Sequence, residues 1–289
     1  MAKLIFGRGY LGLRVARRWR EAGEQVHVAT RSPQRARALA AEGLAPLVAD
    51  VTRPASLRGL PAAETALFAV GHDRAGGPSI EEVYVGGLEN VLDALPAATG
   101  RVIYISTTGV YGNSAGDWVD EDSPCEPTRP GGKASLAAEE ALRRRPLGAR
   151  AIVLRLAGLY GPGRVPNRAP LLAGEPLAVP TEGFLNLIHV DDAVAAVLAA
   201  ATLEIEPPRT YLISDGHPAP RGEYYAELAR LLGAPAPRFV EPPAGDARAA
   251  RAAADKRIDN ARMLTELRIA LAFPSYREGL AAIVGGLDG

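Results

Sequence analysis

The sequence predicts an α/β protein in which a doubly wound, mainly parallel sheet is joined to a small, mostly helical C-terminal cap subdomain. Three observations lead to this prediction. Short apolar runs alternate with helical stretches through the first half of the 289 residues, as expected for parallel strands that are buried on both faces. A glycine-rich turn directly follows the first run. Beyond Gly158 the alternation gives way to segments rich in Pro and Gly and to further helices, which we assign to the cap.

Apolar runs mark the expected strands, and apolar residues at helical spacing mark the expected helices. The strands are predicted at Leu4–Phe6, Val26–Thr30, Leu47–Ala49, Ala66–Val70, Val102–Ile105, Ala151–Leu156 and Thr210–Ile213. The helices are predicted at Gly9–Ala22, Pro33–Glu42, Ile80–Leu95, Ser135–Arg145, Val190–Ala201 and Glu223–Leu232. We expect a loop from Pro162 to Gly183 and a mostly helical tail from Asp246 to Gly289.

Charge and composition exclude several classes of protein. The 33 basic and 33 acidic residues cancel, so no net field attracts nucleic acid or an anionic membrane. Cys125 is the only cysteine, which excludes an intramolecular disulfide and a multi-cysteine metal site, and no metal site is expected. The N-terminus shows no signal peptide, and no apolar run approaches the roughly 18 residues of a membrane span. We therefore expect a cytoplasmic protein with a small-molecule substrate, and a homodimer is one assembly open to it.

A phosphate-binding loop is predicted directly after the first strand. The segment reads Gly7-Arg8-Gly9-Tyr10-Leu11-Gly12 and opens the first helix. In the Rossmann-type fingerprint the first glycine permits a tight turn, the second lets the backbone approach a pyrophosphate, and the third lets helix and strand pack closely. The alternative is a turn that needs glycine for packing only. We predict an NAD(P)-binding Rossmann domain at residues 1–158 plus 186–213, and a small substrate or cap region at residues 159–185 plus 214–289.

The end of the second strand indicates which dinucleotide binds. An NAD site places Asp or Glu there to accept a hydrogen bond from the ribose 2′-OH, whereas an NADP site places a cation for the 2′-phosphate. The sequence here is Thr30-Arg31-Ser32, without an acidic residue, and Arg8 could add a second cation. Only three of the 33 basic residues are lysines, so a merely solvated arginine is the alternative. The sequence favours NADP over NAD.

Several further motifs follow the glycine loop in order. They are Asp50-Val51, Ala69-Val70-Gly71, the segment from Ser106 to Gly112 (STTGVYG), the segment from Leu154 to Gly163, and residues 186–192 (NLIHVDD). With the glycine loop they resemble the extended and atypical short-chain dehydrogenase/reductases, the NAD(P)-dependent epimerase/dehydratase group. The resemblance implies that Asp50 and Val51 hold the adenine and that residues 69–71 lie beside the cofactor. It also implies a nucleotide sugar as the substrate class.

The catalytic pair of that family is missing from this chain. Members that transfer hydride use a Tyr and, four residues later, a Lys that lowers the pKa of the Tyr from its ordinary value near 10. Alignment of the following helix puts Gly131 at the Tyr position and Ser135 at the Lys position. Lys133 lies two residues early, an offset of about 200° on a helix. It could reach a ribose only if the preceding glycines stay extended, and we expect an exposed lysine instead.

Four residues remain as candidates for catalysis or substrate binding. By the resemblance, Thr107 aligns with the Ser or Thr that hydrogen-bonds a substrate oxygen, and Tyr111 is the nearby phenol; structural roles are the alternatives for both. His189 could titrate near neutral pH and bind substrate, or it could anchor the loop before a helix capped by Asp191. Arg164 could grip the diphosphate of a nucleotide sugar, or it could be solvated.

Two functions of different classes are compatible with these residues. The first is an NADP-binding oxidoreductase or epimerase that acts on a small polar substrate, in which the nicotinamide supplies the redox step and Thr107, with Tyr111 or water, supplies a proton route. The second is a non-catalytic NADP-binding redox sensor or regulatory protein, which keeps the glycine loop without the Tyr–Lys pair. We prefer the first.

Overall fold

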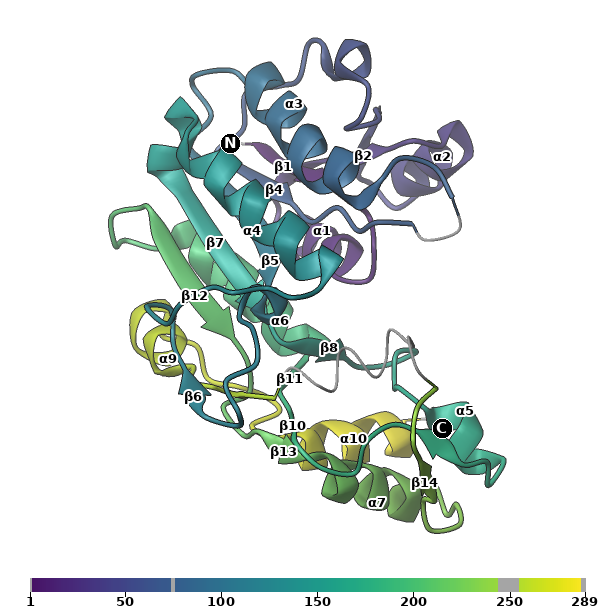
Figure 1. Ribbon diagram of the computed structural model, residues 1–289. Helices are drawn as coiled ribbons and strands as arrows, with labels where there is room; N and C mark the ends of the chain where they lie inside the picture. Colours follow the sequence, from purple (N-terminus) through teal and green to yellow (C-terminus); the bar gives the residue numbers. More distant parts are fainter. Residues whose placement is uncertain (1, 74–75, 244–254, 287–289) are drawn as a thin grey trace. The chain divides into compact units, whose positions relative to one another are not determined.

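The computed structural model describes residues 2–73, 76–243 and 255–286, and the chain forms two compact units (Figure 1). The first unit contains Met1–Thr107, Pro130–Arg155 and Val194–Tyr211, and the second contains Thr108–Arg129, Leu156–Ala193 and Leu212–Gly289. Compactness alone does not define an independently folding domain, so the domain boundaries predicted from the sequence remain a prediction.

A seven-stranded sheet organises the first unit. Its strands are β1 (Ala2–Phe6), β2 (Gln25–Thr30), β3 (Ala45–Val48), β4 (Thr65–Phe68), β5 (Arg101–Thr107), β7 (Ala151–Leu156) and β12 (Arg209–Ile213). The order is β12-β7-β5-β4-β1-β2-β3, and β1 pairs in parallel with both β2 and β4. The predicted doubly wound parallel sheet is therefore confirmed. The strand order reverses beside β1, which is where ligands bind in such sheets.

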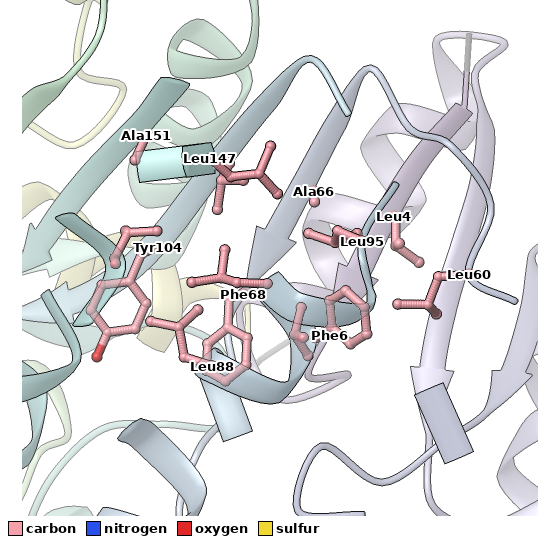
Figure 2. Packing of buried hydrophobic residues seen from close by; sticks show 14 of the residues in the cluster. Leu4, Phe6, Leu60, Ala66, Phe68, Leu88, Leu95, Tyr104, Leu147 and Ala151 are labelled. Atoms are coloured by element: carbon pink, nitrogen blue, oxygen red, sulfur yellow. The ribbon is translucent and has the colours of Figure 1, made fainter. Parts of the chain in front are cut away.

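Helices cover the sheet on both faces. They are α1 (Gly12–Glu21), α2 (Pro33–Ala41), α3 (Gly87–Ala94), α4 (Pro130–Arg143) and α6 (Val190–Thr202). Leu4, Phe68 and Tyr104, from three strands of the sheet, belong to one buried cluster with Leu88 of α3 (Figure 2). Ala138 and Leu142 of α4 belong to the same cluster, so α3 and α4 cover one face of the sheet (Figure 1). The helix predicted at 80–95 contains a π-helical stretch, Glu82–Gly86, before α3. The helix predicted from Ser135 begins five residues earlier, at Pro130.

The second unit combines short paired strands with helices. The strands are β6 (Trp118–Val119), β8 (Gly158–Tyr160), β9 (Leu177–Ala178), β10 (Phe184–Leu185), β11 (Leu187–His189), β13 (Ala219–Pro220), β14 (Phe239–Val240) and β15 (Arg257–Ile258). The helices are α5 (Arg168–Leu172), α7 (Arg221–Leu231), α9 (Ala261–Leu267) and α10 (Tyr276–Gly285). A loop throughout 162–183 was the wrong expectation, because α5 and β9 form there. Two helices occupy the described part of the predicted helical tail, and residues 246–254 and 287–289 lie outside the described residues.

Neither a membrane-spanning helix nor a metal-ligand cluster occurs in the described part of the chain. No helix there is both long and apolar enough to cross a bilayer. Within the same ranges, no group of three or more His, Cys, Asp or Glu residues is placed to hold a metal ion.

Candidate functional site

The glycine loop has the backbone geometry that its sequence predicts. Gly7 adopts a φ of +103°, and a Cβ there would lie 2.7 Å from the backbone nitrogen of Val70. A Cβ on Gly12 would overlap the carbonyl oxygen of Gly7, whereas a Cβ on Gly9 would meet no atom within 4 Å. Gly7 and Gly12 are therefore required for the turn and for packing. The space above Gly9 is open to a ligand.

The other loop residues are held by neighbours of α1. The Arg14 guanidinium lies 4.1 Å from the centre of the Tyr10 ring and donates a hydrogen bond to the Tyr10 carbonyl at 2.9 Å. Leu11 is buried. The first turn of α1 contains no acidic residue, so its backbone N–H groups remain favourable for an anion.

A cavity of about 400 Å³ lies in the first unit around this loop, within the usual range for ligand sites. It is lined by Gly7, Arg8, Gly9, Ala29, Thr30, Arg31, Arg35, Ala49, Asp50, Val51, Thr52, Val70, Gly71, His72, Asp73, Gly76, Pro78 and Val83. These residues include Gly7, Arg8, Gly9, Arg31, Asp50, Val51, Val70 and Gly71, which the sequence predicts to bind the cofactor. The cavity wall thus gathers the segments that follow β1, β2, β3 and β4.

Among the residues that the structure describes, three arginines line this cavity. Arg8 comes from the glycine loop, Arg31 from the end of β2, and Arg35 from the first turn of α2. The Ser32 hydroxyl accepts a hydrogen bond from the Arg35 backbone N–H at 3.3 Å and caps α2. Sequence reasoning missed Arg35. The N-cap at Ser32 was the available signal, because it places the third residue of the helix at the edge of the cavity.

The segment after β3 is fixed by hydrogen bonds of its own. The Asp50 carboxylate accepts bonds from the Thr52 backbone N–H at 3.0 Å and from the Thr52 hydroxyl at 2.8 Å. The Val51 carbonyl accepts a bond from Asn90 of α3 at 2.9 Å. The predicted adenine-binding residues therefore form a preformed wall of the cavity.

The positions of the missing Tyr–Lys pair are occupied by small residues on α4. A Cβ on Gly131 would have only the Ile80 Cδ1 within 4 Å, at 3.9 Å. Ser135 is buried and hydrogen-bonds the hydroxyl of Tyr104, a buried tyrosine whose pKa is raised mainly by desolvation. Lys133 is exposed and helical, because α4 already begins at Pro130. The extended glycines that would let Lys133 reach a ribose are therefore absent from this segment.

A buried ion-pair network fixes the end of β5, next to Thr107. The Glu139 carboxylate of α4 is fully buried and accepts hydrogen bonds from Arg155 at 2.7 and 3.0 Å. It also accepts one from the Ser106 hydroxyl at 2.6 Å and one from Arg143 at 3.0 Å. Sequence reasoning missed this network. An acidic residue on the apolar face of a predicted helix was its one signal.

The remaining predicted residues belong to the second unit. Tyr111 is 1% exposed, and Arg164 is exposed in a turn in which its backbone N–H donates to the Gly161 carbonyl at 2.9 Å. His189 is 2% exposed, with its ring 3.8 Å from that of Phe273 and 5.3 Å from that of Tyr160. This enclosure favours the structural alternative for His189, and its role in substrate binding remains a prediction.

A further buried acid, Asp215, lies in the second unit. The pKa of Asp215 is raised to about 7, mainly by burial and in part by the negative charge of Asp192. One carboxylate oxygen, Oδ1, accepts a hydrogen bond from the His217 backbone N–H at 2.9 Å. The other, Oδ2, has no hydrogen-bond partner among the described residues.

Comparison with known proteins assigns the chain to one family. Residues 4–214 match the model of the NAD dependent epimerase/dehydratase family. Protein YeeZ from Escherichia coli (strain K12) is 36% identical over 171 residues, which are 57% of this chain and 58% of that protein. The 3-diazoavenalumate denitrifying reductase of a Streptomyces species is 33% identical over 165 residues, 53% of this chain and 54% of that protein. The chain thus aligns with little more than half the length of these relatives.

Solved structures match over the whole chain. An NAD-dependent epimerase/dehydratase candidate from Methylobacillus flagellatus is 30% identical, with a TM-score of 0.79 over 100% of this chain and 99% of that chain. MoeE5 in complex with UDP-glucose and NAD has a TM-score of 0.78 over 100% and 99% of the two chains; at 22% identity this similarity concerns the fold alone. The match of the family model over residues 4–214 shows that the chain belongs to the NAD dependent epimerase/dehydratase family.

Proposed function

We propose that this chain is an NADP-dependent oxidoreductase or epimerase that acts on a small polar substrate, with a nucleotide sugar as the substrate class. The single observation that carries the preference for NADP is the set of three arginines, Arg8, Arg31 and Arg35, on the cavity wall around the end of β2. Such a cluster favours binding of a 2′-phosphate, because guanidinium groups bind phosphate with charge-assisted, often bidentate hydrogen bonds.

The residues of the cavity fit a dinucleotide. The backbone N–H groups of residues 7–12 and the start of α1 would bind the diphosphate above Gly9, where the structure leaves space. The segment at Asp50 and Val51 would hold the adenine. When bound, the nicotinamide supplies the redox chemistry.

The proton route of this proposal uses the chain's own side chains. Thr107 ends β5, and its neighbour Ser106 is tied to the buried Glu139 network. We assign to the Thr107 hydroxyl the hydrogen bond to the substrate oxygen. Tyr111 or a water molecule would complete the route, since Gly131 and Ser135, at the positions of the family's Tyr and Lys, carry no acid or base that could exchange a proton near neutral pH.

The substrate class has support of a different kind. MoeE5, which shares the fold, was solved with UDP-glucose, and a relative is named as a reductase. Arg164, exposed in its turn, is our candidate for contact with a diphosphate. The second candidate function, a non-catalytic NADP-binding sensor, is favoured by Gly131 and Ser135 at the positions of the catalytic pair.

Cofactor titrations test the proposal. We expect the purified chain to bind NADPH about 10- to 100-fold more tightly than NADH, as measured by nucleotide fluorescence, because the 2′-phosphate gains one or two charge-assisted bonds. The double variant R31A/R35A should lose this preference. R37A, which changes an exposed arginine of α2 outside the cavity lining, should keep it. NADH binding as tight as NADPH binding would refute the assignment.

A turnover screen separates the enzyme from the sensor. Nucleotide sugars are incubated with the chain and with its Thr107→Ala variant, once with NADP as the hydride acceptor and once with NADPH as the hydride donor. Turnover that falls in the variant supports the enzyme. Tight NADPH binding without turnover of any nucleotide sugar supports the sensor.

A further inference from the structure

The three lysines of the chain occupy three different environments. Lys3 is 2% exposed and pairs with Glu64 at 3.1 Å and with Glu24 at 3.8 Å. Lys133 is exposed. Lys256 is 5% exposed, yet no carboxylate of the described residues lies within ion-pair distance of its Nζ. A buried ammonium without an opposite charge is costly, so Lys256 needs an explanation.

The contacts of Lys256 place it on the segment that resembles the family's active-site strand end. Its Nζ donates hydrogen bonds to the carbonyls of Tyr111 at 3.4 Å and Gly112 at 3.3 Å. These are the last two residues of the STTGVYG segment, which begins at Ser106. An ammonium group has three N–H donors, so one remains for another acceptor.

The surrounding backbone holds Lys256 in place. The carbonyl of Asp255 accepts bonds from the backbone N–H groups of Ser114 and Gly116, and β15 pairs with β6 from Arg257 onward. Asn186 donates a hydrogen bond to the carbonyl of Lys256 itself at 2.9 Å. The backbone of residues 255–258 is therefore fixed to the loop after Tyr111.

The surroundings of Nζ disfavour the positive charge of Lys256. The pKa of Lys256 is lowered to about 8, mainly by burial and in part by the positive charge of Arg129, while the negative charge of Asp255 opposes both effects. The Asp255 carboxylate is itself engaged, because its Oδ1 accepts a bond from the Phe184 backbone N–H at 2.8 Å. Lys256 therefore lies in the positive field of Arg129, and no carboxylate of the described residues forms an ion pair with its Nζ.

We propose that Lys256 binds an oxyanion of the substrate, a phosphate or a carboxylate, at the loop that ends with Tyr111 and Gly112. This inference rests on the proposed function, since it names the chemical class of the substrate of that same site. It restricts the substrate to an anionic molecule. The missing counter-ion of Lys256 is then part of the ligand.

Proton uptake on binding tests this proposal. An oxyanion at Nζ would raise the pKa of Lys256 well above 8, so binding at pH 8 should take up about half a proton per chain. Titration calorimetry of the full chain in buffers of different ionisation enthalpy measures this number. The probes are UDP for the phosphate, glucuronate for the carboxylate, and uridine as the uncharged control.

Each outcome bears on the proposal. Uptake with UDP alone identifies a phosphate, and uptake with glucuronate alone identifies a carboxylate; either result supports Lys256 as the anion site. Binding without uptake for both, or no binding of either probe at 10 mM, overturns it. NADPH titration of the same preparation tests the proposed function separately, because the cofactor cavity belongs to the other unit.

Variants assign the proton to Lys256. K256M should lose the uptake and weaken probe binding about tenfold or more, whereas K133M should change neither. If K256M does not fold, K256R decides, because arginine keeps the charge but does not release its proton near pH 8. K256R should then bind the probe without proton uptake. Uptake that persists in either Lys256 variant overturns the proposal.

Discussion

Buried charged side chains of the two units differ in whether an opposite charge lies within ion-pair distance. In the first unit, Lys3 pairs with Glu64 and Glu24, and Glu139 pairs with Arg155 and Arg143. In the second unit, Lys256 and Asp215 are almost fully buried, and no oppositely charged side chain of the described residues lies within ion-pair distance of either. Paired charges fix a scaffold. Unpaired buried charges cost stability, so they indicate positions kept for a ligand or for a proton.

Breaking the paired network of the first unit should have the largest effect. Glu139→Ala leaves Arg155, which is 3% exposed, buried without its partner. We expect a loss of about 3–5 kcal/mol in the free energy of unfolding, measured by urea denaturation at pH 7. A loss below 1 kcal/mol would show that the network is not a structural support.

Removing the unpaired carboxylate of Asp215 in the second unit should instead raise the free energy of unfolding. The pKa of Asp215 is raised from 3.8 to about 7, so the folded state binds the proton more tightly and wild-type stability falls as the pH rises from about 4 to 7. Asp215→Asn has no carboxylate to ionise. We expect it to be more stable than the wild type by about 2–4 kcal/mol at pH 8, with a difference that shrinks towards pH 4.

The exposed Asp117 of the same unit provides the matched control for this pH dependence. Asp117→Asn should leave the thermal unfolding profile unchanged between pH 4 and pH 8. If Asp215→Asn lowered the free energy of unfolding at pH 8, the ionised carboxylate of Asp215 would be stabilised in the folded protein. The contrast between the two units would then be wrong.

Variants of two loop glycines in the first unit test stability and cofactor binding separately. Gly12→Ala should cost about 1–3 kcal/mol, because its Cβ would overlap the carbonyl oxygen of Gly7. Gly9→Ala should leave stability nearly unchanged, since nothing lies within 4 Å of its Cβ, but it should weaken NADPH binding. Thermal unfolding and nucleotide titration of both variants check this. Normal NADPH affinity in Gly9→Ala would place the diphosphate elsewhere.

The smallest effect is expected at the exposed end of the Glu139 network. Arg143 is 49% exposed in its ion pair, so water screens it. Arg143→Ala should cost about 0–1 kcal/mol, measured by urea denaturation next to Glu139→Ala. Equal losses in the two variants would contradict the view that burial decides the strength of these pairs.

The sequence predicts the first unit better than the second, for physical reasons. Buried parallel strands leave continuous apolar runs, and the glycine loop has steric requirements that a local pattern reveals. The strand pairs β6–β15 and β9–β14 join segments that are distant in the chain and only two residues long, so no local periodicity marks them. Lys256 shows the same limit at the site, since its contacts with Tyr111 and Gly112 depend on that long-range pairing.

The most direct test of the account is a crystal structure grown with excess NADP. We expect the diphosphate to lie above Gly9, within hydrogen-bond distance of the backbone N–H groups of residues 7–12, and the 2′-phosphate to contact Arg31 or Arg35. A cavity that stays empty at saturating NADP, or that is filled by a side chain of the protein, would contradict the account.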